Sequence, residues 1–249
     1  RHHHFVRFAR IFMLLLFLTV WELFADFHII DSFFFSSPSR VVACFVRMVS
    51  ERSLFTHIGI TLTETVISFF LVALVSLSTA TLLWYSRRLS EILEPFLVVL
   101  NSLPKSALAP LLIVWLGTGM DTIIAAGISV AIFGAIINLY TGFLQADPEK
   151  LLLIRTLGGT RRDCFFKVVL PASIPVILSN MKVNIGLSLV GVVIGEFLAA
   201  RRGLGYLIIY GSQVLQLDML ITSILLLCII AMGLYQLLQF AEHCYKKKV

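Results

Sequence analysis

Long apolar stretches alternate with short polar connections along the whole chain. Six of these stretches are long enough to cross a bilayer as helices, since about 20 apolar residues span its hydrocarbon core. They are Phe8–Phe27, His57–Tyr85, Leu93–Leu116, Thr122–Leu144, Ala172–Ala199 and Leu217–Phe240. The pattern predicts an all-α membrane protein with about six transmembrane helices.

The connection after the first stretch predicts one further helix. Ser37 or Ser39 can cap it, and the segment from Arg40 to Met48 that follows has mixed apolar and basic faces. Such a segment is typical of a helix that lies along the membrane surface. We therefore expect one membrane domain over residues 1–249, with the first span and surface helix in 1–56 and a five-helix core in 57–240.

Composition and charge agree with this class. Hydrophobic residues make up 59% of the chain and charged residues only 14%, whereas soluble domains are about a quarter charged. The net charge of +6 raises the possibility of nucleic-acid binding, but the basic residues sit at the ends of apolar segments and no soluble domain remains. Their distribution predicts both termini in the cytoplasm. The four cysteines are scattered and form neither a disulfide framework nor a metal site.

One predicted cytoplasmic connection, residues 145–171, carries unusually strong helix signals. Asp147 is a good N-cap and Pro148 suits the first helical position. Gly158-Gly159 ends that helix, and Thr160 can cap a second one, which Pro171 ends or leads into the next span. The connection is predicted to form two short helices joined by a glycine turn.

These helices are apolar where a cytoplasmic connection should be polar. Leu151–Ile154 is an unbroken apolar run, and Phe165-Phe166 follows. A four-residue run covers every side of a helical turn, so one side can rest on the membrane domain while the others need another partner. The alternative is a hairpin folded entirely against its own spans.

The spacing in this connection resembles a known motif. Gly158, nine residues and then Val168-x-Leu170-Pro171 are similar to the EAA loop of binding-protein-dependent ABC importer permeases. Arg155-Thr156-Leu157-Gly158 resembles the R-T-L-G of the nitrate, sulfonate and taurine branch. Leu152-Leu153-Ile154 occupies the E-A-A positions, so the motif's glutamate is missing.

Shorter resemblances to the same family run along most of the chain. They are Trp21-Glu22, Pro38-Ser39-Arg40-Val41, Leu103-Pro104-Lys105, Ala109-Pro110-Leu111, Trp115-Leu116-Gly117-Thr118-Gly119, Gly195-Glu196-Phe197 and Gly203-Leu204-Gly205-Tyr206-Leu207. Glu64 and Ser68 depart from the pattern, because that branch usually has Arg and Gly there. Order and spacing together make the resemblance specific.

The resemblance implies a type I importer of the bacterial cytoplasmic membrane. Two permease copies, or this chain and a similar one, would work with two cytoplasmic ATPase subunits and an extracytoplasmic solute-binding protein. ATP and Mg would bind the ATPase, and this chain would bind no cofactor. The 145–171 connection would be the coupling loop, and the residues expected to contact the ATPase are Leu152, Leu153, Ile154, Arg155, Leu157, Gly158 and Arg161. The sequence contains no P-loop, HExxH or nucleophile elbow, so we expect no catalytic residues and no enzyme.

The translocation pathway is expected on the fifth span. Its candidate residues are Asn180, Lys182, Asn184 and Glu196. A charge at mid-bilayer costs about 2.5–3.5 kcal/mol on insertion scales, so Lys182 should face protein or water. There it either lines a pathway for an anionic solute such as a sulfonate, taurine or nitrate, or serves helix packing or gating. Gly191-x-x-x-Gly195 allows close approach of another helix, from a second subunit or from the same chain.

Two other classes of protein were weighed. An integral-membrane enzyme needs polar catalytic residues that converge at one membrane face, and the sequence shows only isolated charges. A secondary transporter that works without ATP predicts an internal repeat with broken helices, which is not evident, and leaves the apolar 145–171 connection unexplained.

Overall fold

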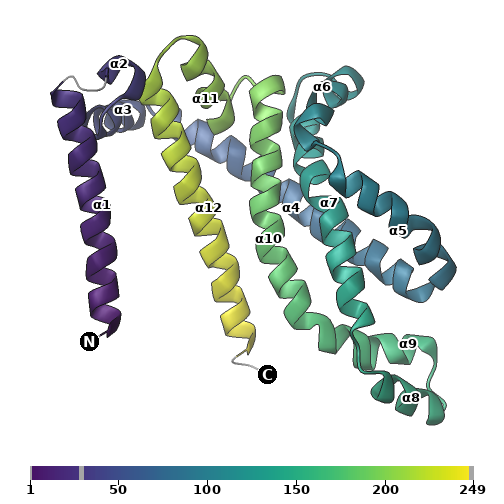
Figure 1. The fold of residues 1–249 in the computed structure, drawn as a ribbon. Coiled ribbons are helices and arrows are strands. Elements are labelled where there is room, and N and C mark those ends of the chain that lie inside the picture. Colours follow the sequence, from purple (N-terminus) through teal and green to yellow (C-terminus); the bar gives the residue numbers. More distant parts are fainter. Residues whose placement is uncertain (1, 28–30, 247–249) are drawn as a thin grey trace. The chain divides into compact units, whose positions relative to one another are not determined.

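The computed structural model describes residues 2–27 and 31–246, and every regular element within those ranges is helical (Figure 1). The elements are α1 His2–Asp26, α2 Ser32–Phe35, α3 Pro38–Ser50, α4 Ser53–Tyr85, α5 Arg87–Ser102, α6 Lys105–Leu116, α7 Met120–Leu144, α8 Pro148–Thr156, α9 Arg161–Cys164, a π-helix at Phe165–Val169, α10 Leu170–Ala199, α11 Leu204–Gln213 and α12 Leu217–Lys246. Two compact units divide the chain, residues 1–59 with 202–229 and residues 60–201 with 230–249. The all-α fold class is as predicted.

Helices long and apolar enough to cross a membrane match four of the six predicted spans. They are Ser53–Tyr85, Met120–Leu144, Arg161–Ala199 and Leu217–Tyr245. The first predicted span falls in α1, whose side chains from residue 2 to residue 11 lie outside the described part, and its crossing of the membrane stays a prediction.

The predicted third span is two helices rather than one. α5 and α6 together are apolar enough to cross a membrane, but they meet at an angle of 98°. The break falls at Leu103-Pro104, where Leu103 has the extended backbone (φ −64°, ψ 141°) that a following proline imposes. The span Leu93–Leu116 is therefore a broken one in this structure.

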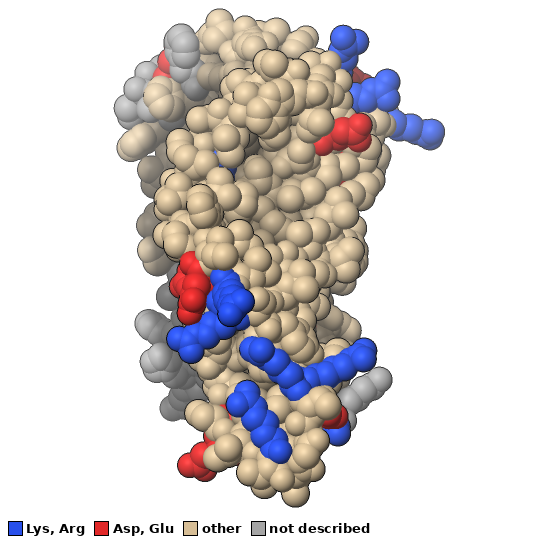
Figure 2. Space-filling view, turned by 90° about the vertical axis from the view of Figure 1, so that its right-hand side faces the viewer, with Lys and Arg blue, Asp and Glu red and all other residues tan. Residues whose placement is uncertain are grey.

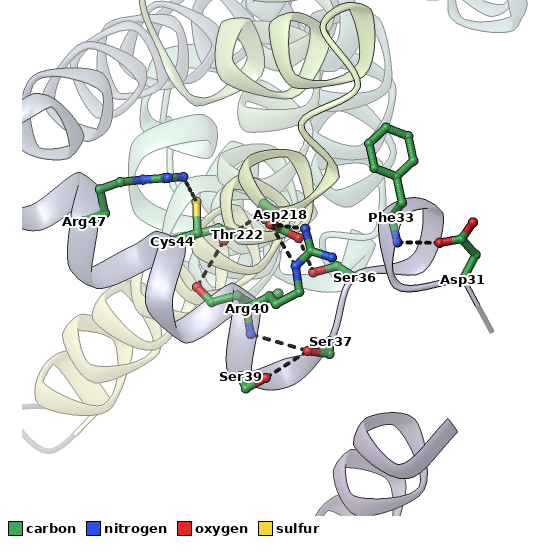
Figure 3. A network of polar contacts seen from close by, with 11 residues as sticks. Asp31, Phe33, Ser36, Ser37, Ser39, Arg40, Cys44, Arg47, Asp218 and Thr222 are labelled. Atoms are coloured by element: carbon green, nitrogen blue, oxygen red, sulfur yellow. Dashed lines mark hydrogen bonds and ion pairs between the residues drawn. The ribbon is translucent and has the colours of Figure 1, made fainter. Parts of the chain in front are cut away.

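In the first unit, polar contacts fix the predicted surface helix, α3 (Figure 3). The Ser37 hydroxyl caps it by accepting from the backbone N–H of Arg40 at 3.4 Å, as predicted for one of two serines. Arg40 also forms an ion pair with Asp218 at 3.0 Å, and the Ser36 hydroxyl donates to the same carboxylate at 2.6 Å. These contacts join α3 to the start of α12.

The first unit also contains α11, a helix that the sequence did not predict. It begins after Gly203, whose φ of 119° favours glycine. The Gly203 backbone N–H donates to Nδ1 of His57 at 2.9 Å, and the His57 ring stacks on Tyr206 with 6.3 Å between centroids. The segment between the last two predicted spans thus contains a helix of its own.

The second unit is built around the contact of α7 with α10. A Cβ placed on Gly191 would lie 2.7 Å from the backbone oxygen of Ala126 and 2.7 Å from Cα of Gly127. A Cβ on Gly195 would lie 3.0 Å from Cα of Ile123. Real Cβ atoms do not approach as closely as the Gly191 distances, so Gly191 is needed for this backbone contact, and a Cβ at Gly195 would be tighter than most real contacts. The sequence left open whether this glycine pair packs against a helix of a second subunit or of the same chain. In the structure it packs against α7 of the same chain.

Candidate functional site: the helical loop and the α7–α10 cavity

α8 has the boundaries that its sequence predicts. Oδ1 of Asp147 accepts from the backbone N–H of Glu149 at 2.9 Å and so satisfies one of the free N–H groups at the helix start. The turn after the helix needs Gly158, whose φ is +80°. The backbone N–H of Gly159 then closes the turn by donating to the carbonyl of Ile154 at 2.8 Å.

The second helix begins at Thr160 as predicted but does not end at Pro171. A capping box starts it: the backbone N–H of Thr160 donates to Oδ2 of Asp163 at 2.9 Å, and the Thr160 hydroxyl accepts from the N–H of Asp163 at 3.3 Å. α9 then runs through the π-helical turn Phe165–Val169 into α10 without a break. Pro171 lies in the first turn of α10, where a missing N–H is tolerated, and therefore leads into the next span.

The second half of the loop packs against its own chain. Phe165 is 2% exposed, and its ring lies 5.2 Å from that of Trp84 and 5.5 Å from that of Phe143, between centroids. Arg161, a predicted contact of the ATPase, donates to the backbone oxygen of Trp84 at 3.3 Å and lies over its ring. This half fits the hairpin interpretation, in which the loop folds against its own spans.

The first half of the loop leaves its apolar side chains uncovered. Leu152, Leu153 and Leu157 are 62%, 57% and 76% exposed. Arg155 is exposed beside them, while Ile154 is half-buried under the glycine turn. Basic side chains gather at the end of the molecule that carries α8 and α9 (Figure 2). α8 is therefore an apolar surface with basic neighbours.

Three of the four predicted pathway residues are buried, and the fourth is paired. Asn180, Asn184 and Glu196 are 6%, 2% and 0% exposed. Lys182 Nζ lies 2.6 Å from Oε2 of Glu242 on α12, and the two side chains are 19% and 13% exposed. The Thr61 hydroxyl donates to Oε1 of Glu196 at 2.6 Å. The structure does not gather the four residues into one site.

A cavity of about 490 Å³ lies between α7 and α10, and Asn180 is the predicted residue that lines it. Its lining is formed by Asn138, Thr141, Gly142, Gln145, Pro175, Val176, Ser179, Asn180 and Val183. Asn180 also lines a smaller void of about 60 Å³ together with Ser76 and Asn184. Its amide donates to the backbone oxygen of Ala135 at 3.4 Å, while its Oδ1 has no hydrogen-bond partner. Asn180 therefore leaves one buried amide oxygen unsatisfied in the helix wall beside the cavity.

The polar cavity-lining residues at the end of α7 were not identified from the sequence as candidates for the pathway. Asn138, Thr141 and Gln145 are spaced three and four residues apart, so they share one face of an otherwise apolar helix. That spacing was the signal that could have found them. Within residues 2–27 and 31–246, no three His, Cys, Asp or Glu side chains are grouped closely enough to hold a metal ion.

Membrane-length helices, a cavity with several polar side chains between two of them and a helical loop with uncovered leucines are features typical of a membrane transport subunit. Residues 72–241 match the family model described as the binding-protein-dependent transport system inner membrane component. The match covers more than half of the chain, and the chain therefore belongs to this family of ABC importer permeases.

Relatives agree with this assignment. A Haemophilus influenzae protein described as a probable ABC transporter permease is 30% identical over 91% of both chains. The formylaminopyrimidine transport permease of Halalkalibacterium halodurans is 28% identical over 77% of this chain and 76% of its own. The taurine transport system permease of Escherichia coli is 26% identical over 86% and 80%.

Solved structures confirm the fold class. An inward-facing structure of the MetNI methionine ABC transporter matches with a TM-score of 0.66 at 19% identity, over 80% of this chain and 97% of that one. The fold is thus that of type I ABC importer permeases, as the sequence resemblance implied.

Proposed function

We propose that this permease imports a small anionic solute by ATP-driven alternating access, with α8 docked on a cytoplasmic ATPase subunit. The exposure of Leu152, Leu153 and Leu157 on a capped helix is the observation that carries the proposal. Complete burial of one leucine side chain contributes roughly 1.5–3 kcal/mol, so three leucines supply enough free energy for a stable contact. Arg155 provides a charged rim to that contact.

The loop connects α8 to α10 in a way that can transmit a movement. α8 is joined through the Gly158-Gly159 turn to α9, and α9 continues as one helix into α10. Phe165, buried against Trp84 and Phe143, is the fixed point of this arrangement. A displacement of α8 by an ATPase would therefore be transmitted to α10, which lines the cavity with Ser179 and Asn180.

The cavity lining supports a small polar solute. Amide and hydroxyl groups of Asn138, Thr141, Ser179 and Asn180 can donate hydrogen bonds to sulfonate or carboxylate oxygens. The named function of the taurine permease relative agrees with a solute that carries a sulfonate group. The formylaminopyrimidine permease relative favours a second candidate, a neutral heterocycle, which the same uncharged lining can also bind.

The assembly that this function requires contains several other chains. We propose a second permease copy, two ATPase subunits that bind ATP and Mg, and an extracytoplasmic solute-binding protein. Both termini would lie in the cytoplasm, on the same side as α8. This arrangement is supported by family membership and by the position of basic residues along the sequence.

Leu153→Asp tests the docking of α8. A carboxylate in a desolvated leucine contact should weaken ATPase binding at least about tenfold, as substitutions at interface hot spots do. The measurement is co-purification of the ATPase with the tagged permease, together with ATP-dependent uptake in proteoliposomes. Arg88→Asp is the control, because it places the same carboxylate in the first turn of α5, outside the loop. Normal ATPase recovery and uptake in Leu153→Asp would refute the proposal.

A further inference from the structure

Two carboxyl groups meet inside the second unit, apart from the polar cavity. Glu64 on α4 and Glu196 on α10 are 3% and 0% exposed, and Thr61, which lies one helical turn before Glu64, contacts Glu196 directly. The Thr61 hydroxyl donates to Oε1 of Glu196 at 2.6 Å. Oε2 of Glu64 is buried without any hydrogen-bond partner. Such a pair of buried acidic groups requires a ligand that separates or neutralises their charges.

The hydroxyl groups next to Glu64 along α4 do not compensate a charge on it. Thr65 donates its hydroxyl to the backbone oxygen of Thr61 at 2.7 Å, and Ser68 donates to that of Ile124 at 3.3 Å. No ion pair joins Glu64 to a basic side chain in the described part of the chain. An ionised Glu64 would therefore be an uncompensated buried charge.

The facing helix adds no charge. At the level of Gly195, one residue before Glu196, α7 presents Ile123 and Ala126 to α10. These side chains are apolar and close-packed, so solvent does not reach the pair from this side. Two carboxylates in such surroundings repel each other strongly, and sharing one proton removes the repulsion.

We propose that Glu64 and Glu196 form a proton-binding site in which the two carboxyl groups share one proton. Glu64 is the carboxylic acid and donates to the Glu196 carboxylate, whose other partner is the Thr61 hydroxyl. The Thr61 contact favours this direction because a hydrogen bond to a carboxylate is stronger than one to a neutral acid, and the unpartnered Oε2 of Glu64 is less costly on a neutral group. The bound proton joins α4 to α10.

The experiment is infrared spectroscopy of the purified permease in nanodiscs at neutral pH. A protonated carboxylic acid has a carbonyl stretch well separated from that of a carboxylate. We expect this band in the wild type, its loss in Glu64→Gln and its retention at a shifted frequency in Glu196→Gln. Glu149→Gln, at an exposed glutamate of α8, is the matched control and should leave the band unchanged.

Two results would overturn the site. One is that no carboxylic-acid band of the wild-type spectrum disappears in Glu64→Gln. The other is loss of the band in Glu196→Gln but not in Glu64→Gln, which would reverse the assignment of donor and acceptor. A parallel measurement tests whether a metal ion occupies the site instead of a proton. If Na⁺ raises the unfolding temperature of the wild type but not that of Glu64→Gln, the proposal is contradicted.

Discussion

The α7–α10 contact and α8 are both apolar helical regions of one compact unit, yet their residues meet opposite surroundings. Around Gly191 and Gly195 the backbones of α7 and α10 lie close together, with no space for a Cβ atom at Gly191 and little at Gly195. On α8, Leu152, Leu153 and Leu157 are more than half exposed. Both regions are rich in apolar residues, but only the residues of the α7–α10 contact are closely packed against other parts of the protein.

The difference shows how structural and functional surfaces can be told apart in a membrane chain. Leucines that face lipid need no protein partner, but α8 lies in a connection with caps, a glycine turn and basic neighbours. Those polar features are typical of a helix in water, where we propose that the exposed leucines form a binding surface. The α7–α10 contact, in contrast, is already complete.

The largest effect is expected for Gly191→Val, which breaks the close-packed region. Its Cβ would collide with the Ala126 carbonyl and the Gly127 backbone, and overpacking of this kind costs about 3 kcal/mol. The measurement is the free energy of unfolding in detergent. Gly186→Val is the control, because an added Cβ there meets no atom within 4 Å. Equal stability of the two variants would contradict the described packing.

An intermediate effect is expected at the contact of α10 with α12. Lys182→Met removes the ammonium partner of Glu242 and should lower the unfolding temperature. The double variant Lys182→Met/Glu242→Gln should recover both unfolding temperature and uptake, since it removes both charges together. Recovered stability with uptake still lost would assign Lys182 to the solute pathway instead.

The smallest effect is expected at the start of α9. Thr160→Ala removes the hydroxyl of the capping box and should destabilise the loop by about 1 kcal/mol. Hydrogen exchange should become faster at the first amides of α9, while global unfolding stays unchanged because Thr160 is exposed. Thr156→Ala, at an exposed position of α8, serves as the comparison. Unchanged exchange in α9 would show that the cap contributes nothing.

Local chemistry made much of the fold predictable. Caps at Ser37, Asp147 and Thr160 and the positive φ of Gly158 depend on neighbouring residues only, and each lies where the pattern placed it. The long apolar stretches likewise became helices, because a backbone in lipid must satisfy its hydrogen bonds internally.

Contacts between distant parts of the sequence were not predictable in this way. Lys182 finds Glu242 on another helix, and Arg161 finds the carbonyl of Trp84 at the end of α4. Periodicity reports which face of a helix is polar but not which helix packs against it. The cavity between α7 and α10 and the Glu64–Glu196 pair depend on that packing, so they emerged only from the structure.

The most direct test of the account is a cross-link from α8 in the complete transporter. Leu153→Cys, made after the exposed Cys228 and Cys244 are changed to serine, would carry a short photo-reactive group. The same group at Leu74→Cys, on the exposed face of α4, serves as the control. The account predicts efficient linkage to the ATPase from position 153 and none from position 74. Linkage from position 153 only to its own chain would contradict it.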